Sequence, residues 1–251
     1  MLTDDLSRRG FVKRSALVAA ATLPLSPTLP ASRAAHLKIV CVGAHPDDPE
    51  SGCGGTLLRY AALGHAVTIV YLTRGERGIA GKSLEEAARI RTAESEAACR
   101  IIGAKPVFFG QIDGATEVTR AQVDAMTRLL AAERPDILLT HWLVDTHMDH
   151  QVASMLTIRA WMSLGAGGLY FFEVDTGSQT EGFLANTYID ITPVLDKKKA
   201  ALFAHVSQDG QGIWREHHEV MAQWRGREVG VAAAEAFVQL HRDHSNFLPG
   251  L

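Results

Sequence analysis

The apolar stretch LKIVCV, residues 37–42, runs directly into GAHPDDPESGCGG, residues 43–55. Its unbroken apolar character is typical of a strand buried on both faces, and such strands occur in parallel sheets that are covered by helices. A histidine and two aspartates follow within four residues: His45, Asp47 and Asp48. Because open α/β sheets bind ligands at the carboxyl ends of their strands, the stretch predicts a buried strand with a polar site at its end.

The same alternation of apolar runs and helix-like stretches continues along the chain. We expect further strands at residues 66–73, 105–109, 136–140 and 168–174, and helices at residues 54–63, 84–102, 120–133 and 151–164. After residue 174 the pattern loosens, and it indicates an edge strand at 187–192 followed by a helix that starts near Pro193. Together these elements predict an α/β fold with a Rossmann-like, doubly wound, mostly parallel sheet and helices on both faces.

Length and composition bound the possible functions. The 251 residues are 47% hydrophobic, enough for one large core in a single domain. A net charge of −3 and a pI near 6.4 argue against nucleic acid as a partner, which would require a basic patch. The three cysteines match neither a zinc-binding nor a disulfide pattern, so we expect them to be small buried side chains.

Residues 1–34 have the layout of an export signal, and we place the globular domain at residues 35–251. A basic segment with Arg8 and Arg9 in SRRGFVK precedes a short apolar run, which a stretch rich in proline, serine and alanine follows. The paired arginines indicate a twin-arginine signal, although they could also be a chance pair in a basic tail. The apolar run is too short to be a stable membrane anchor. We therefore expect the twin-arginine export machinery as a partner and a periplasmic or extracellular location.

A second polar stretch, HWLVDTHMDH at residues 141–150, follows the fourth expected strand. If the strand order is 3-2-1-4-5, the first and fourth strands are neighbours, and His45, Asp48, His147 and His150 can converge. A set of two histidines and one aspartate leaves an open coordination position, as catalytic zinc sites require. Such a set also accepts Fe²⁺.

Glycines 52, 54 and 55 raise the alternative of a dinucleotide-binding turn. The sequence GCGG lacks the G-x-G-x-x-G spacing, and the neighbouring carboxylates Asp47, Asp48 and Glu50 would repel a pyrophosphate. We instead expect these glycines to allow close packing at the start of the following helix.

The stretch AHPDDPESGCGGTL, together with HMDH, is similar to the PIG-L/LmbE family of metal-dependent N-deacetylases, which remove acetyl groups from N-acetylglucosamine-type sugars. Further matches are LTRGE, RIRTAESEAACRIIGA, IDG, YIDIT and KKKAALFAHVSQ, so the resemblance covers residues 37 to about 208. The family's first motif often reads HPDDE. Here Pro49 precedes Glu50, which leaves the role of Glu50 open.

The resemblance assigns His45, Asp48 and His150 as the metal ligands, the same three that the residue types suggest. Asp47 would be the general base that takes a proton from the attacking water, with a helix N-cap as its alternative role. His147 would not ligate the metal, and as an imidazolium it could stabilise the developing oxyanion or protonate the leaving amine. Asp149 could orient His147, or it could be a solvated loop acid.

Two further positions match residues that the family uses around the sugar. These are Arg91 and Asp113, although Arg91 could instead pair with Glu94 on a helix surface and Asp113 could be an ordinary turn aspartate. Six other histidines have no spacing that demands a metal and are expected to be structural or superficial: His141, His205, His217, His218, His241 and His244.

These observations predict an exported zinc hydrolase that deacetylates an N-acetylglucosamine-type sugar or a glycoconjugate that carries one. One alternative is an amidase that removes a larger acyl group from a sugar amine. A carbohydrate-binding relative without catalytic activity is a second alternative.

Overall fold

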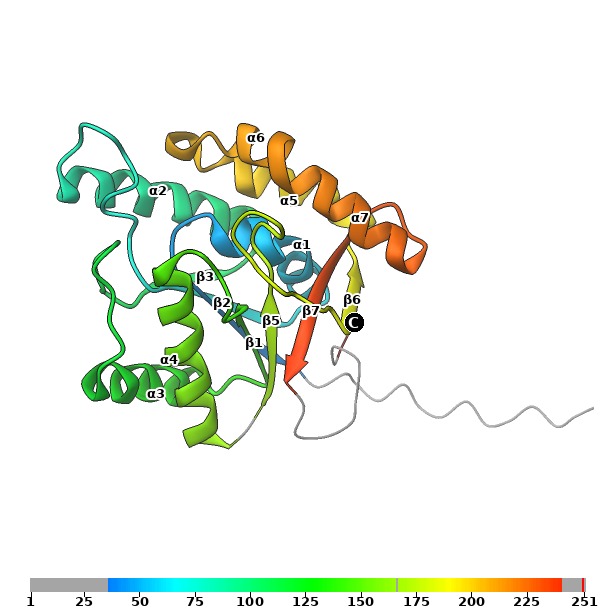
Figure 1. The fold of residues 1–251 in the computed structure, drawn as a ribbon. Helices are drawn as coiled ribbons and strands as arrows, with labels where there is room; N and C mark the ends of the chain where they lie inside the picture. Colours follow the sequence, from blue (N-terminus) through cyan, green and yellow to red (C-terminus); the bar gives the residue numbers. More distant parts are fainter. Residues whose placement is uncertain (1–35, 166, 241–249, 251) are drawn as a thin grey trace, which may run out of the picture. The chain divides into compact units, whose positions relative to one another are not determined.

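The computed structural model describes residues 36–165, 167–240 and Gly250. Within these residues, seven strands form one sheet in the order β3-β2-β1-β4-β5-β7-β6 (Figure 1). The strands are β1 Lys38–Gly43, β2 Ala66–Tyr71, β3 Lys105–Phe108, β4 Ile137–His141, β5 Gly168–Phe172, β6 Thr187–Asp190 and β7 Ala234–Leu240. The expected export signal lies outside the described residues.

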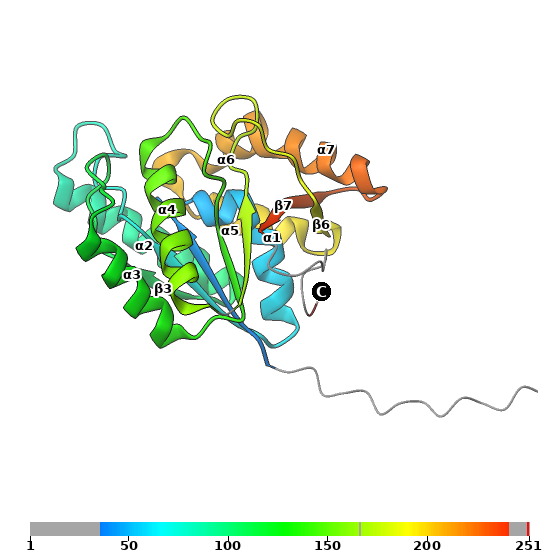
Figure 2. The ribbon, with the colours of Figure 1, turned by 60° about the horizontal axis from the view of Figure 1, so that its bottom comes forward.

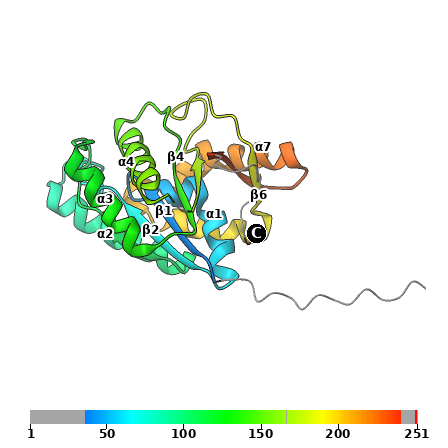
Figure 3. The ribbon, with the colours of Figure 1, turned by 90° about the horizontal axis from the view of Figure 1, so that it is seen from below.

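Helices cover both faces of this sheet (Figures 1 and 2). The helices are α1 Asp48–Ala62, α2 Leu84–Ile102, α3 Arg120–Glu133, α4 Met148–Leu164, α5 Leu195–Phe203, α6 Gly210–Ile213 and α7 Glu219–Val229. Helices α3 and α4 pack together on one face, and α1, α2 and α5 lie on the other (Figure 3). A π-helical turn, Trp214–His218, joins α6 to α7. No helix in the described part of the chain is both long and apolar enough to cross a bilayer.

Strand β1 shows how one apolar run serves two cores. Ile39 and Cys41 pack toward α1 and α2, whereas Val40 and Val42 pack toward α3 and α4. Successive side chains of a strand point to opposite faces, so only a continuous apolar run can fill both cores. All three cysteines are buried and unpaired, as expected.

The predicted strand order is confirmed for the first five strands, and β6 is the edge strand that residues 187–192 indicated. Strand β7 was not predicted, and it inserts antiparallel between β5 and β6. Its sequence, AEAFVQL, carries the buried polar residues Glu235 and Gln239, which interrupt the apolar run by which the other strands are recognised.

Helix α1 begins at Asp48, six residues before the predicted start, and it is kinked at Cys53. Gly52 and Gly55 lie where a Cβ atom would come within 2.5 Å of Phe172 and 2.6 Å of Ile191, so both are required for close packing. This confirms the predicted packing role for Gly52 and Gly55 but not for Gly54, where a Cβ atom would meet its nearest neighbours at an ordinary 3.7 Å.

The carboxylate of Glu235 caps the second half of α1. It accepts hydrogen bonds from the backbone amides of Gly55 and Thr56 at 2.8 and 2.7 Å, and it pairs with the buried ammonium of Lys198 at 2.6 Å. Free amides at the start of a helix are where a phosphate would bind. A protein carboxylate already occupies them here, which argues against the dinucleotide alternative.

Candidate active site

Strands β1 and β4 are parallel neighbours, so the loops that follow them lie side by side at the same edge of the sheet. The two polar stretches of the sequence therefore meet, although about a hundred residues separate them. They form one wall of a pocket of about 510 Å³. The predicted site residues that line this pocket are His45, Asp47, Asp48, Arg91, Asp113, His147 and His150.

The three expected metal ligands converge. Nδ1 of His45 lies 3.2 Å from one carboxylate oxygen of Asp48, and Nε2 of His150 lies 3.4 Å from the other. These side chains come from the loop after β1, the first turn of α1 and the first turn of α4. Three overlapping sets of described side chains could hold a metal ion: His45/His147/His150, Asp48/His141/His150 and His45/Asp113/Asp149. The expected trio spans the first two sets, and its two imidazoles and one carboxylate are donors suited to Zn²⁺ or Fe²⁺.

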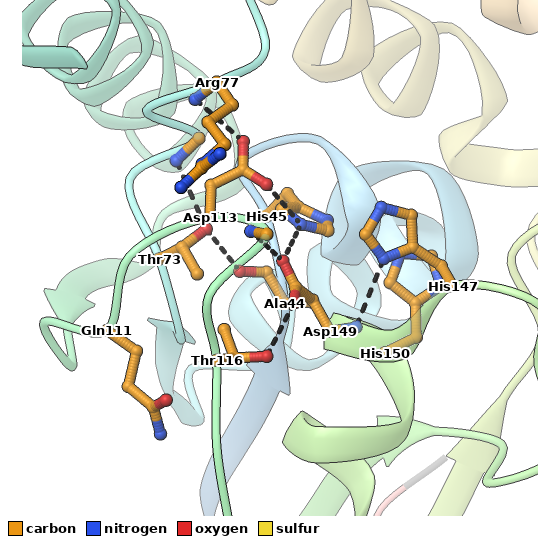
Figure 4. Close-up of polar contacts among 12 residues, drawn as sticks. Ala44, His45, Thr73, Arg77, Gln111, Asp113, Thr116, His147, Asp149 and His150 are labelled. Carbon is orange, nitrogen blue, oxygen red and sulfur yellow. Dashed lines mark hydrogen bonds and ion pairs between the residues drawn. The ribbon is translucent and has the colours of Figure 1, made fainter.

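The other ring nitrogen of each histidine faces a second carboxylate. Nε2 of His45 lies 3.0 Å from Asp149, and Figure 4 shows the ring between Asp149 and Asp113. Nδ1 of His150 lies 3.1 Å from Asp145. Carboxylates in this position fix the orientation of a ligating histidine and increase its basicity.

The charge balance also fits a cation. Burial opposes the ionisation of these carboxyl groups, yet contacts with neighbouring histidines and amides lower the pKa of Asp48, Asp113, Asp145 and Asp149. Burial likewise opposes charge on His150, but Asp48 and Asp145 raise its pKa to about 9. Burial opposes charge on His45 as well, yet its carboxylate neighbours raise its pKa, so the carboxylates are balanced by two protonated rings whose protons a divalent cation would replace.

Asp47 occupies the N-cap position of α1, but its side chain makes no capping hydrogen bond. Its φ of 102° is unusual for a residue other than glycine, and it turns the carboxylate toward Arg91, whose guanidinium lies 3.0 Å away. Burial raises the pKa of Asp47 to about 6, although Arg91 opposes the shift. The alternative pairing of Arg91 with Glu94 is wrong, because Glu94 accepts hydrogen bonds from Ser207.

His147 is the N-cap of α4, and its Nδ1 accepts a hydrogen bond from the backbone amide of Asp149 at 3.2 Å. The proton of the ring therefore lies on Nε2, and burial near His45 lowers the pKa of His147. The sequence led us to expect a protonated His147 ring, but this geometry favours the neutral ring. A neutral ring with an Nε2–H donor fits the observed hydrogen bond.

The prediction that the Asp149 carboxylate orients His147 is wrong. That carboxylate accepts hydrogen bonds from Thr116 at 2.6 Å and from the amide of Gly114 at 2.8 Å, and its remaining contact is with His45 (Figure 4). Asp149 is fully buried and is not a solvated loop acid. It thus orients a candidate metal ligand rather than His147.

Asp145 and His141 are site residues that the sequence reasoning missed, although both lie in the stretch 141–150. His141 stacks on His150 with ring centroids 4.2 Å apart, and its Nε2 accepts a hydrogen bond from the amide of Ala44 at 2.9 Å. That nitrogen lies 3.4 Å from Asp48, but the bond to Ala44 occupies it. His141 therefore holds the loop after β1 in place, and together with Asp48 and His150 it also forms one of the sets that could hold a metal ion.

The other histidines that were expected to be structural or superficial differ in their locations. His205 is fully buried beside Glu50, whose carboxylate also accepts a hydrogen bond from Tyr71 at 2.5 Å, so Glu50 faces the core and not the pocket. His217 and His218 line the pocket, which the sequence did not indicate. His241 and His244 lie outside the described residues.

Comparisons with known proteins agree with this geometry. The family model PIG-L, described as GlcNAc-PI de-N-acetylase, matches residues 40–161, a range that contains both polar stretches. A solved structure, a conserved protein from Thermus thermophilus, has a TM-score of 0.73 and 28% identity. The match covers 86% of this chain and 99% of that one.

Two curated relatives are similar over most of their length. Diacetylchitobiose deacetylase of Thermococcus kodakarensis is 28% identical over 234 residues, which cover 85% of this chain and 84% of the relative. The 4-oxalmesaconate hydratase of Pseudomonas putida is 32% identical over 224 residues, which cover 78% of this chain and 84% of the relative. With these matches and the two motifs at one pocket, the chain belongs to the PIG-L family.

Proposed function

We propose that this protein is a metal-dependent N-deacetylase that acts on an N-acetylglucosamine-type sugar or a glycoconjugate. The observation that carries the proposal is the convergence of His45, Asp48 and His150 beside Asp47, in a pocket large enough for a sugar ring. The family match and the deacetylase relative support it.

His45, Asp48 and His150 would hold the metal, with Asp149 and Asp145 orienting the two rings. When bound, the metal acts as a Lewis acid toward the acyl oxygen and makes water more acidic. The donor set suits zinc and Fe²⁺, so metal analysis of protein purified without oxygen distinguishes the two.

Asp47 is placed to move the proton. Its carboxylate lines the pocket, is not used as a helix cap, and is held by Arg91. It would accept a proton from the water that attacks the amide carbonyl, and then pass that proton to the nitrogen as the carbon–nitrogen bond breaks. One carboxylate can serve as base and then as acid in this order.

His147 supplies the donor for the negative charge that develops on the acyl oxygen. Its Nδ1 is fixed by the amide of Asp149, so its Nε2–H is held in one orientation. A preorganised donor of this kind stabilises an oxyanion without becoming charged itself. Arg91 and Asp113 also line the pocket, but Arg91 pairs with Asp47 and Asp113 contacts His45 and the Arg77 amide, so a role for either beside the sugar would be shared with these contacts.

The direct test measures acetate and free amine released from N-acetylglucosamine and its β-1,4-linked oligomers by the metal-loaded protein. Asp47→Asn is the control, because it removes the proposed base. Longer acyl groups offered on the same sugars decide between a deacetylase and an amidase with a wider acyl pocket. Binding of the sugars without turnover of any substrate would indicate the noncatalytic alternative.

Hydration of a carbon–carbon double bond is a second candidate, because the relative with 32% identity is a hydratase. The pocket lining includes Asp47, Asp48, Asp113 and Asp175, opposed by Arg77 and Arg91. Such a lining suits a neutral sugar better than a substrate with several carboxylates. Loss of the ultraviolet absorbance of 4-oxalmesaconate in the presence of the protein would decide for the hydratase.

We also propose that the protein acts outside the cytoplasm, on the basis of the amino-terminal sequence alone. Arg8 and Arg9 precede an apolar run in the order that a twin-arginine signal has. This route exports folded proteins, which would allow the metal to be inserted before export.

A further inference from the structure

A second pocket, of about 420 Å³, lies between α7 and the segment that follows β5. Trp224 is its main aromatic side chain, and 59% of that residue is exposed. Val220 lies one helical turn before Trp224 on the same face of α7 and is 68% exposed. Two large apolar side chains are thus open to solvent beside one pocket. We call this the outer pocket.

The outer pocket borders the active-site pocket along two segments. In the segment after β5, Val174 and Asp175 line the active-site pocket, whereas Glu173 and Thr176 line the outer pocket. From the π-helical turn into α7, the lining passes from the active-site pocket to the outer pocket between His218 and Val220. A contact of 3.0 Å between the Asp175 carboxylate and Nδ1 of His217 joins the two segments at this border.

A small cavity of about 20 Å³ lies beside both pockets. It shares Ser51 and His218 with the active-site pocket, and it shares Glu173, Met221 and Arg225 with the outer pocket. The two pockets are therefore close neighbours in the fold.

The polar groups of the outer pocket suit a carbohydrate. Gln223 and Arg227 are exposed beside Trp224, and no carboxylate pairs with the Arg227 guanidinium within the described residues. Arg225, by contrast, is held by Glu173 at 2.6 Å. A sugar ring presents C–H groups on one face, which pack on an aromatic ring, and hydroxyl groups at its edge, which amide and guanidinium groups bind.

We propose that the outer pocket binds a second sugar ring of the substrate, with Trp224 as the stacking platform, so that the enzyme prefers oligosaccharides to a single amino sugar. This inference rests on the proposed function, because the reacting sugar must occupy the active-site pocket while a neighbouring ring reaches α7. Trp224 then determines specificity and takes no part in the chemistry.

The test compares kcat/KM for N-acetylglucosamine with kcat/KM for its β-1,4-linked dimer, trimer and tetramer. We expect the oligomers to be better substrates, and we expect Trp224→Ala to lower the ratio of oligomer to monomer by roughly 2- to 12-fold, the usual worth of an aromatic contact. Trp224→Tyr keeps an aromatic ring at this position and should retain most of the wild-type preference for oligomers over the monomer. Met162→Ala, an equally exposed side chain on α4, is the matched control and should change nothing.

The proposal is overturned if kcat/KM does not depend on the chain length of the sugar. It is also overturned if Trp224→Ala lowers the ratio of oligomer to monomer kcat/KM no more than Met162→Ala does. Light scattering provides a second check, because an oligomer that Trp224→Ala dissociates would make this face an interface between copies. If no sugar is hydrolysed, the proposed function fails. The outer pocket is then tested by the indole NMR signal of Trp224, which must shift when the tetramer is added.

Discussion

A carboxylate oxygen of Asp145 lies 3.1 Å from Nδ1 of His150 and so leaves Nε2 of that ring for the pocket. We predict that Asp145→Asn lowers metal affinity by about 10- to 100-fold, because the ring loses the carboxylate that orients it. His150→Ala should lower the affinity further, since one of three ligands is removed. Metal content after dialysis against buffered metal checks both variants. Asp124→Asn, on the exposed surface of α3, is the control and should bind metal normally.

Asp47 and Asp48 should separate proton transfer from metal binding. Asp47→Asn keeps the size of the side chain but cannot accept a proton at neutral pH. We expect it to retain its metal while kcat falls by roughly 10²- to 10⁴-fold, the usual contribution of a general base. Asp48→Asn should lose metal instead. Equal loss of metal in the two variants would contradict the roles given to these carboxylates.

The buried pair of Glu235 and Lys198 should contribute strongly to stability. Glu235→Ala leaves the ammonium of Lys198 buried without its partner and removes the cap of Gly55 and Thr56, so we expect a loss of about 3–5 kcal/mol in the free energy of unfolding. The control is Lys105→Ala, which removes an exposed ion pair and should cost about 1 kcal/mol or less. Urea unfolding of both variants measures the difference.

His218 should make the fold sensitive to mild acid. Burial, with Lys198 nearby, lowers its pKa from 6.5 to about 3, so folding favours the neutral ring. Its contribution to stability is complete above the unfolded pKa of 6.5 and is lost progressively as the pH falls toward 3. At about pH 5 the loss should be about 2 kcal/mol.

His218→Gln removes this titration while keeping an uncharged polar side chain. The difference in unfolding free energy between neutral pH and about pH 5 should therefore be smaller in the variant than in the wild type. His45 and His150 titrate in both proteins, so their contribution cancels in the comparison. If the difference in unfolding free energy between the two pH values is the same in the variant and the wild type, His218 is not held neutral by the fold.

Export can be tested without reference to the fold. Replacing Arg8 and Arg9 by lysine keeps the charge of the segment but removes the paired arginines that the export machinery recognises. We expect the precursor to remain in the cytoplasm, which cell fractionation measures. Normal export of the double variant would contradict a twin-arginine signal.

The sequence predicted most of the sheet because β1, β2, β4 and β5 are buried on both faces and must be continuously apolar. Strand β7 lacks that pattern because Glu235 is buried at its start as the cap of a distant helix. Glycine has low helix propensity, yet α1 begins at Asp48 and runs through Gly52, Gly54 and Gly55, so tertiary packing overrides propensity at this turn.

The spacing of residues within each polar stretch predicted the three candidate ligands. The strand order was enough to predict that the two stretches meet. The roles of the surrounding residues depended on side-chain directions, which spacing does not determine. Asp149 follows His147 by two residues, yet at the first turn of α4 its carboxylate points to His45. The Trp224 pocket depends on how α7 lies against the segment after β5, and no short sequence motif encodes that arrangement.

The cap that Glu235 places on α1 joins residues 180 positions apart. A growing chain therefore presents both polar stretches long before the carboxylate that completes the ligand-bearing helix has been synthesised. Because closing so long a loop is slow compared with forming a local helix, the pocket should reach its final geometry only after β7 has entered the sheet. Ribosome-bound chains that end before β7 would consequently contain the proposed metal ligands without the support that fixes them.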